Sequence, residues 1–135
     1  MTAPGRADAV RVLIVDDHAP FRTAAKLVFD VLDGFEVVGE ATSGEEALEL
    51  AASLAPALVI MDIRLPGING VDATRRLVGA NPQTVVLLVS TYDAGDLPLG
   101  AASCGALAYV HKEHLDADLV ERLWSERDLG LWRTA

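Results

Sequence analysis

Acidic side chains stand directly after two of the apolar segments of this 135-residue sequence. Asp62 ends the run Leu58–Met61, and the turn signals Leu-Pro-Gly and Asn-Gly follow it. Asp16 and Asp17 follow the apolar run Val10–Val15 in the same manner. Any one of these acids alone is equally well explained as the cap of a following helix. Their significance depends on which residues occupy equivalent places elsewhere in the chain.

A hydroxyl group and an ammonium group follow two further apolar runs. Ser90 comes after Val85–Val89, and Lys112 comes just after Leu107–Val110. Short helical patterns separate the apolar runs, which is typical of a parallel sheet with helices on both faces. Since the carboxyl ends of parallel strands share one edge of a sheet, these two groups should lie beside the three acids. Such a convergence is not expected of unrelated caps and surface residues.

The residue types at this predicted edge suit phosphoryl transfer. Three carboxylates in one crevice repel each other, so at least one has a raised pKa or the set binds a cation. Oxygen ligands in this number suit Mg²⁺, which uses one or two carboxylates and accepts phosphate oxygens. A carboxylate can attack phosphorus in line while a metal ion and a lysine neutralise the phosphoryl oxygens. The sequence therefore predicts a phosphoryl-transfer site with Mg²⁺ as its cofactor.

Strands and helices are expected to alternate along the whole chain. The predicted strands are Val10–Val15, Phe35–Ala41, Leu58–Asp62, Val85–Val89 and Leu107–Val110, with Phe35–Ala41 near the sheet edge. The predicted helices cover residues 20–33, Gly44–Leu54, Gly70–Gly79, Leu97–Ser103 and a last segment capped by Asp116. This order predicts an α/β fold, a doubly wound five-stranded parallel sheet in a single domain. We expect residues 1–9 to be a flexible N-terminal tail, residues 10–127 to be the domain, and residues 128–135 to be a C-terminal tail or the start of a linker.

Composition excludes several classes of protein. The formal net charge is −9 and no basic cluster is present, so the chain alone is a poor ligand for DNA. No apolar run approaches the roughly 18 residues of a membrane span, and the first residues do not resemble a signal peptide. A single cysteine, Cys104, excludes an internal disulfide framework. We therefore expect a cytoplasmic protein without membrane contact.

Taken together, the motifs resemble the receiver domain of bacterial two-component response regulators. The resemblance covers about Arg11 to Arg127. It consists of the acid pair after the first strand, Asp62 after the third, the Leu65–Gly70 loop, Ser90 after the fourth, and Tyr109 with Lys112 at the fifth. It implies a flavodoxin-like (βα)5 fold and a regulatory phosphoacceptor that takes its phosphoryl group from a histidine kinase. Such a domain is not an enzyme acting on an external substrate.

The resemblance also implies a role for each acid. Asp62 would be the phosphoacceptor and a metal ligand. Asp17 would bind Mg²⁺ directly, whereas Asp16 would act largely through a metal-bound water. The backbone carbonyl of Arg64 would complete the protein ligands.

The remaining implied roles concern the phosphoryl group and the response to it. Lys112 and Ser90 would hold the phosphoryl oxygens. Tyr109 would be the aromatic side chain whose orientation follows Ser90, so Ser90 and Tyr109 together would form the switch. A changed surface could then bind a partner or a second copy of the chain as a homodimer.

Details of the motifs are similar to the subgroup that usually precedes a LuxR-type helix-turn-helix, and they suggest control of transcription. Three features depart from that pattern. Ser90 stands where many members have Thr, and Glu113 follows Lys112 where many have Pro. The sequence stops at Ala135 without a helix-turn-helix, so DNA would be bound only through an output domain absent from it. The chain is then either a stand-alone regulator or a piece that ends before its output domain.

Three other functions are compatible with parts of the pattern. A phosphatase with an aspartyl nucleophile usually has a second acid two residues after the first, but here that residue is Arg64. A flavodoxin-like nucleotide binder needs a phosphate loop rich in Gly, Ser and Thr after the first strand, where this chain has Asp-Asp-His-Ala-Pro. A degenerate receiver that acts as a protein-binding scaffold without phosphorylation would not need the intact set of acid, hydroxyl and lysine.

Overall fold

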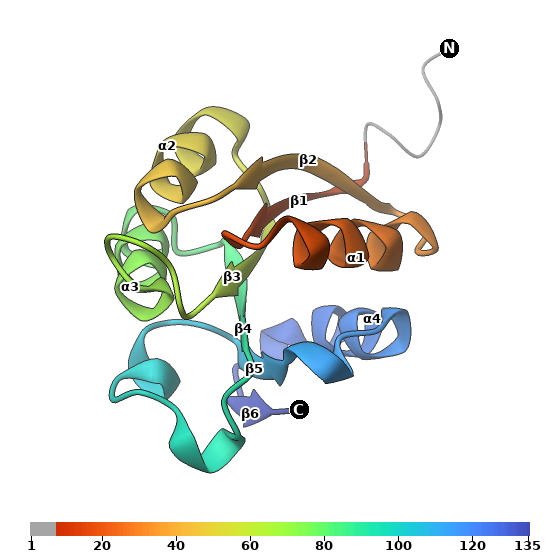
Figure 1. The fold of residues 1–135 in the computed structure, drawn as a ribbon. Coiled ribbons are helices and arrows are strands. Elements are labelled where there is room, and N and C mark those ends of the chain that lie inside the picture. Colours follow the sequence, from red (N-terminus) through yellow and green to blue (C-terminus); the bar gives the residue numbers. More distant parts are fainter. Residues whose placement is uncertain (1–7) are drawn as a thin grey trace.

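A computed structural model describes residues 8–135, so the predicted N-terminal tail, residues 1–9, lies almost wholly outside the described part. Six parallel strands form one sheet in the order β2-β1-β3-β4-β5-β6 (Figure 1). The strands are β1 (Val10–Val15), β2 (Phe35–Ala41), β3 (Leu58–Asp62), β4 (Val85–Ser90), β5 (Ala108–His111) and β6 (Arg133–Thr134). The predicted parallel α/β sheet is confirmed, and β2 lies at its edge as expected. None of the helices among the described residues is long and apolar enough to cross a membrane.

Four α-helices cover the two faces of the sheet. The helices are α1 (Ala19–Asp30), α2 (Gly44–Leu54), α3 (Gly70–Ala80) and α4 (Ala117–Ser125). Helices α1 and α4 lie on one face, and α2 and α3 lie on the other (Figure 1). This doubly wound arrangement follows from right-handed crossovers on either side of the first strand, and it leaves every strand's carboxyl end on one edge.

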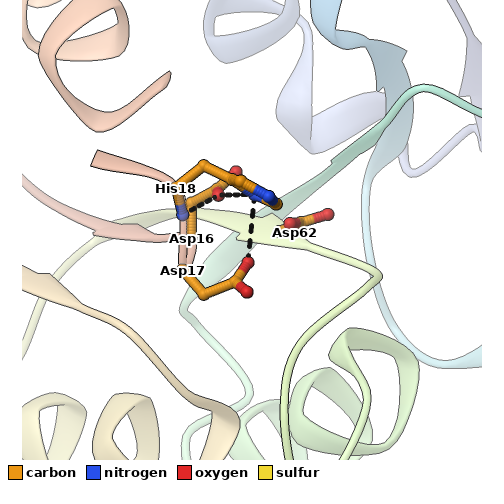
Figure 2. A group of neighbouring side chains, drawn as sticks. All are labelled: Asp16, Asp17, His18 and Asp62. Carbon is orange, nitrogen blue, oxygen red and sulfur yellow. Dashed lines mark hydrogen bonds and ion pairs between the residues drawn. The ribbon is translucent and has the colours of Figure 1, made fainter. Parts of the chain in front are cut away.

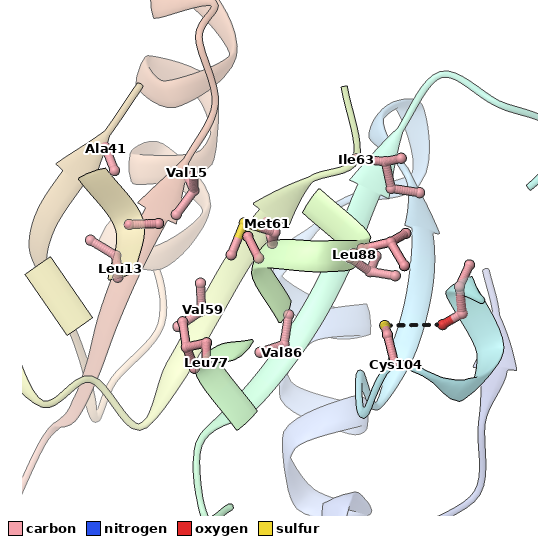
Figure 3. Packing of buried hydrophobic residues seen from close by; sticks show 14 of the residues in the cluster. Leu13, Val15, Ala41, Val59, Met61, Ile63, Leu77, Val86, Leu88 and Cys104 are labelled. Carbon is pink, nitrogen blue, oxygen red and sulfur yellow. Dashed lines mark hydrogen bonds between the residues drawn. The ribbon is translucent and has the colours of Figure 1, made fainter. Parts of the chain in front are cut away.

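Strand β3 is the centre of both cores, because all five of its residues are buried. Val59 and Met61 pack with residues of α2 and α3 on one face, part of which Figure 3 shows. Leu58 and Ile60 pack with α1 and α4 on the other. A strand covered on both faces needs a continuous apolar run, which explains why Leu58–Met61 lacks alternation. Asp62 is the first polar residue of this run, and it stands where the strand leaves the core.

Side-chain caps mark the starts of three of the α-helices. The hydroxyl of Ser43 accepts a hydrogen bond from the Glu46 N–H at 3.1 Å, and the Glu46 carboxylate accepts one from the Thr42 N–H. Ser43 therefore caps α2 as in a capping box, although the Glu46 carboxylate bonds to the N–H of the residue before the cap and not to that of Ser43 itself. Asn69 and Asp116 cap α3 and α4 in the same way, each accepting a hydrogen bond from the N–H three residues later.

The predicted helix Leu97–Ser103 is wrong. The structure has two 3-10 turns there, Ala94–Asp96 and Ala101–Ser103, joined by extended chain. Leu97 is extended at φ −65° and ψ 144°, as expected for a residue before proline. Gly100 has a left-handed φ of +88°, which interrupts any helix at that point. Pro98 and Gly100 therefore break the helix rather than merely shorten it.

The C-terminal residues add a strand that the sequence did not predict. After a 3-10 turn at Arg127–Leu129, the chain runs beside β5 as β6. Residues 128–135 were expected to be a tail or the start of a linker, yet part of this segment completes the sheet. Only two residues form β6, too few for a recognisable strand pattern.

Candidate functional site

Four residues from two strand ends meet at the carboxyl edge of the sheet. Oxygen or nitrogen atoms of Asp16, Asp17, His18 and Asp62 all lie within 4.8 Å of one another (Figure 2). Asp16 and Asp62 are buried, with 0% and 1% of their surface exposed, whereas Asp17 and His18 are exposed. The predicted convergence of the two acid motifs is therefore present in the structure. The cluster opens to solvent on the side of Asp17.

Lys112 reaches the two buried acids from the end of β5. Its ammonium nitrogen lies 2.7 Å from Asp16 Oδ2 and 3.4 Å from Asp62 Oδ2. It also lies over the ring of Phe21, 4.6 Å from the ring centre. Although Lys112 is close to Asp16 Oδ2, that oxygen receives no well-aligned hydrogen bond. One lysine thus faces two buried carboxylates, and the balance of charge remains negative.

This imbalance changes the acidity of Asp62. Burial, and to a lesser extent the charge of Asp16, raise the pKa of the Asp62 carboxyl from 3.8 to about 6. The Lys112 ammonium and the Arg64 N–H act in the opposite direction. An elevated pKa among neighbouring carboxylates marks the part of the molecule where an added cation would be most stabilising.

His18 is a member of this cluster that sequence reasoning missed. Its Nδ1 lies 3.2 Å from Asp16 Oδ1 and 3.1 Å from Asp17 Oδ1, so the ring bridges the two acids (Figure 2). Its backbone N–H also donates to Asp16 Oδ1 at 2.8 Å. No role in the site was predicted for His18 from the sequence. Its position directly after the acid pair was the available signal.

The loop after β3 holds the Asp62 carboxylate in place. The Arg64 N–H donates to Asp62 Oδ1 at 3.1 Å, and the Gly70 N–H donates to the carbonyl of Ile63 at 2.8 Å. A β-carbon at position 70 would lie 2.0 Å from the carbonyl oxygen of Asp62, so only glycine fits there. The guanidinium of Arg64 lies over the ring of Tyr92, 4.3 Å from its centre. The metal role expected for the Arg64 carbonyl stays a prediction.

Ser90 and Tyr109 lie on the neighbouring strands. Asp62 pairs with Val89, so Ser90 is the next residue along β4 and is buried beside the acid site. The hydroxyl of Tyr109 donates to the carbonyl oxygens of Ser90 at 3.0 Å and Tyr92 at 2.6 Å. Burial raises the pKa of Tyr109 to about 12, so its hydroxyl keeps its proton. In this structure the Tyr109 side chain is turned inward and held there.

Comparison with known proteins agrees with this geometry. Residues 12–124 match the family described as the response regulator receiver domain. The chain belongs to this family. A response regulator GacA from Pseudomonas viridiflava is 39% identical over 114 residues, which are 84% of this chain and 53% of that protein. The chain spans about half the length of the curated relatives it matches.

Solved receiver structures share the fold. A LuxR-family two-component response regulator from Aurantimonas sp. SI85-9A1 superposes with a TM-score of 0.81 at 29% identity, covering 94% of this chain and 89% of that one. The receiver domain of a putative response regulator NarL from Mycobacterium tuberculosis gives a TM-score of 0.79 at 29% identity, covering 90% and 98%. This chain is therefore a regulatory receiver domain of the two-component type, as the sequence motifs indicated.

Proposed function

We propose that Asp62 accepts a phosphoryl group from the phosphohistidine of a histidine kinase. The carboxylate oxygen attacks phosphorus, the bond from phosphorus to the histidine nitrogen breaks, and the imidazole leaves with the bonding electron pair. The product on this chain is an acyl phosphate. The support is the position of Asp62, a buried carboxylate held at a strand end by the Arg64 N–H and facing the Lys112 ammonium.

The acid cluster suits a resident Mg²⁺ ion. The oxygens of Asp16, Asp17 and Asp62 converge, and Asp16 Oδ2 lacks a well-aligned donor. We assign Asp17 and Asp62 as direct ligands, Asp16 as a ligand largely through water, and the Arg64 carbonyl as a further ligand. Hard oxygen donors in this number fit Mg²⁺. When bound, the ion neutralises charge on the phosphoryl oxygens.

Lys112 and Ser90 complete the site around the phosphoryl group. Lys112 exchanges its contact with Asp62 for one with a phosphoryl oxygen, and its contact with Asp16 keeps the ammonium in position. The Ser90 hydroxyl donates to another oxygen, which draws the end of β4 toward Asp62. Because the Tyr109 hydroxyl bonds to the Ser90 carbonyl, that movement weakens the bond holding Tyr109 inward. The phosphoryl group thereby selects a second conformation of the β4–β5 side.

The consequence for the cell is a change of binding partner rather than turnover of an external substrate. We propose that the domain works in the cytoplasm, where its kinase presents the phosphohistidine. The altered surface would allow homodimerisation. Control of transcription through an output domain outside these 135 residues fits relatives such as the transcriptional regulatory protein DegU of Brevibacillus brevis, of which this chain covers 46%. DNA would then be contacted by that output domain alone.

Phosphorylation by a small phosphodonor tests the assignment without the kinase. Purified protein with Mg²⁺ should gain one acid-stable, base-labile phosphoryl group, and a chelator should prevent this. Asp62→Asn should not be phosphorylated. Asp93→Asn makes the same chemical change at an exposed acid and is the matched control. Equal labelling of Asp62→Asn and Asp93→Asn would exclude Asp62 as the acceptor.

A further inference from the structure

The C-terminal strand closes an edge of the sheet that would otherwise be open. Gly130, with a left-handed φ of +67°, turns the chain after the Arg127–Leu129 turn. The chain then runs parallel to β5, with Arg133 beside Ala108 and Thr134 beside Tyr109. Figure 1 shows β6 beyond β5, at the end of the sheet opposite β2. Without it, the outer backbone groups of β5 would be unpaired.

Two hydrogen bonds attach the last residue to the strand that carries Tyr109. The Ala135 N–H donates to the Tyr109 carbonyl at 2.8 Å, and the His111 N–H donates to the Ala135 carbonyl at 2.8 Å. Backbone groups alternate in direction along a strand, so the N–H of Thr134 points to the open side. The bonds of Ala135 therefore extend the pairing of Arg133 and Thr134 with β5 and hold the end of this segment to the Tyr109–His111 backbone.

Side-chain contacts to the same segment are few. Trp132 is half-buried against the apolar cluster that contains Tyr109. Arg133 forms an ion pair with Glu126, both partly exposed. Leu129 and Leu131 remain 62% and 60% exposed. Ala135 packs against the other apolar cluster. A two-residue strand with two half-buried apolar side chains and one partly exposed ion pair is nevertheless a light attachment compared with the buried strands.

We propose that the outer edge of β5 is a strand-addition site for an extended peptide, filled here by residues 131–135 of the same chain, which leave it when Tyr109 moves. The second half of this proposal rests on the function proposed above. Strand addition uses backbone hydrogen bonds for affinity and side-chain pockets for specificity. Here the Tyr109–His111 backbone supplies the bonds, and the cluster beneath Trp132 supplies the pocket.

The link to the acid site runs through Tyr109, which is held at two points. Its hydroxyl bonds to the Ser90 and Tyr92 carbonyls on the inner side, and its own carbonyl bonds to Ala135 on the outer side. Trp132 packs on the same cluster as the Tyr109 ring. Turning the ring outward removes a member of the cluster on which the indole packs, and this would loosen the strand that carries Trp132. Conversely, pairing of β6 with β5 favours the inward orientation of the Tyr109 side chain.

The chain's own segment is the expected occupant because of its tether. Gly130 alone separates the 3-10 turn at Arg127–Leu129 from residues 131–135, so the local concentration of the segment at the edge is high. A second copy of the chain offers the same residues but without this advantage. Exchange between copies would make occupancy depend on protein concentration, which the experiment below detects.

Amide hydrogen exchange on the full chain tests the strand-addition site. The Leu107 N–H donates to the Val86 carbonyl on the inner edge of β5, so it is an internal reference for His111 on the outer edge. Ala135→Pro removes the donor to Tyr109 and should speed exchange at His111 by about tenfold or more relative to Leu107. Thr134→Pro is the matched control, because the N–H that it removes points away from β5. In this variant the His111 amide should exchange as fast as in the wild-type chain. An unchanged exchange rate of the His111 amide in Ala135→Pro would overturn the proposal that residues 131–135 fill a strand-addition site on β5.

The coupling is tested in the wild-type chain with Mg²⁺ and beryllofluoride as the phosphoryl mimic. Binding of the mimic is read separately from NMR shifts around Asp62. His111 exchange should then rise while Leu107 stays unchanged. Shifts at Asp62 with unchanged His111 exchange would overturn the coupling. No shifts at Asp62 would count against the proposed function instead, and protection of His111 that rises with protein concentration would show a second copy, not the chain's own segment, on the edge.

Discussion

Asp62 lies in an environment that disfavours its charge. Asp16 and Asp62 are both buried and share one lysine, so ionised Asp62 is stabilised less than it would be in water. Its pKa of about 6 means that the folded protein binds the Asp62 proton more tightly than the unfolded chain, where the value is 3.8. The stability gained from this proton is complete below about pH 4 and is lost as pH rises through about 6. At neutral pH the ionised Asp62 carboxylate therefore lowers stability.

We expect Asp62→Asn to be more stable than wild type at about pH 7.5 in the absence of divalent metal. The pKa shift sets an upper limit of roughly 3 kcal/mol, and about 1–2 kcal/mol is expected because Lys112 loses one partner. The gain should vanish near pH 4. Urea unfolding at several pH values measures it, with the exposed Asp93→Asn, expected within about 0.5 kcal/mol of wild type, as control. A gain independent of pH would show that the charge of Asp62 is not its source.

Metal binding should offset the loss of stability caused by the ionised carboxylates. Mg²⁺ at about one hundred times its dissociation constant should stabilise the native protein by roughly 2.7 kcal/mol by mass action. Asp17→Ala should lose most of this stabilisation while remaining folded, since the Asp17 side chain is partly exposed and outside the core. Thermal unfolding with Mg²⁺ and with a chelator measures the difference. An equal Mg²⁺ shift in Asp17→Ala and wild type would remove Asp17 from the ligand set.

Much of this residue-scale picture was predictable because strand ends are easy to locate. Asp16, Asp17, Asp62 and Lys112 each follow an apolar run, and a parallel sheet brings such positions together. The place of His18 directly after the acid pair put it near the site, but the contact of its ring with both acids depends on a rotamer and was not predictable. The inward state of Tyr109 was also inaccessible, because its acceptors are backbone carbonyls of residues 17 and 19 positions earlier in the chain.

At the scale of elements, the turn from β3 into α3 decides where Asp62 points. Gly70 begins α3, and its α-carbon packs against the Asp62 carbonyl. Gly79 lies near the exposed end of the same helix, where an added β-carbon would meet nothing within 4 Å. An alanine at position 70 therefore tests close packing, whereas an alanine at position 79 tests helix propensity in the same helix.

Gly70→Ala should destabilise the fold by at least about 2 kcal/mol, because the new β-carbon would have to displace backbone. Gly79→Ala should stabilise the protein by about 0.5–1 kcal/mol through helix propensity. Denaturant unfolding of both variants measures the contrast. The opposite order of stability would mean that the β3–α3 turn adapts freely, contrary to the close contact seen here.

Elements with strong periodicity and clear boundary residues were predicted nearly to the residue, as Val10–Val15 and Gly44–Leu54 show. The predictions failed where proline or glycine lies inside a predicted element, or where an element is very short. Pro98 and Gly100 looked compatible with a short helix but impose extended and left-handed backbone instead. Strand β6 exists because β5 offers an unpaired edge, which is a tertiary fact and leaves no pattern in residues 128–135.

At the scale of the whole molecule, the negative net charge disfavours DNA binding by these 135 residues. The net charge of −9 repels the phosphate backbone. Residues 1–135 alone should show no sequence-specific shift of a DNA duplex at moderate salt, with or without beryllofluoride. An electrophoretic mobility assay measures this, and a specific complex formed by this chain alone would contradict the assignment of DNA contact to a separate output domain.

If the fold serves to present the Asp62 carboxylate to a phosphoryl donor, as proposed above, chemical trapping of the phosphorylated residue shows it most directly. Borohydride reduces an acyl phosphate on aspartate to homoserine, which marks the modified residue permanently. After phosphorylation with Mg²⁺ and a small phosphodonor, peptide mass spectrometry should find homoserine at position 62. Homoserine at Asp16, Asp17 or another acid, with position 62 still aspartate, would contradict the claim.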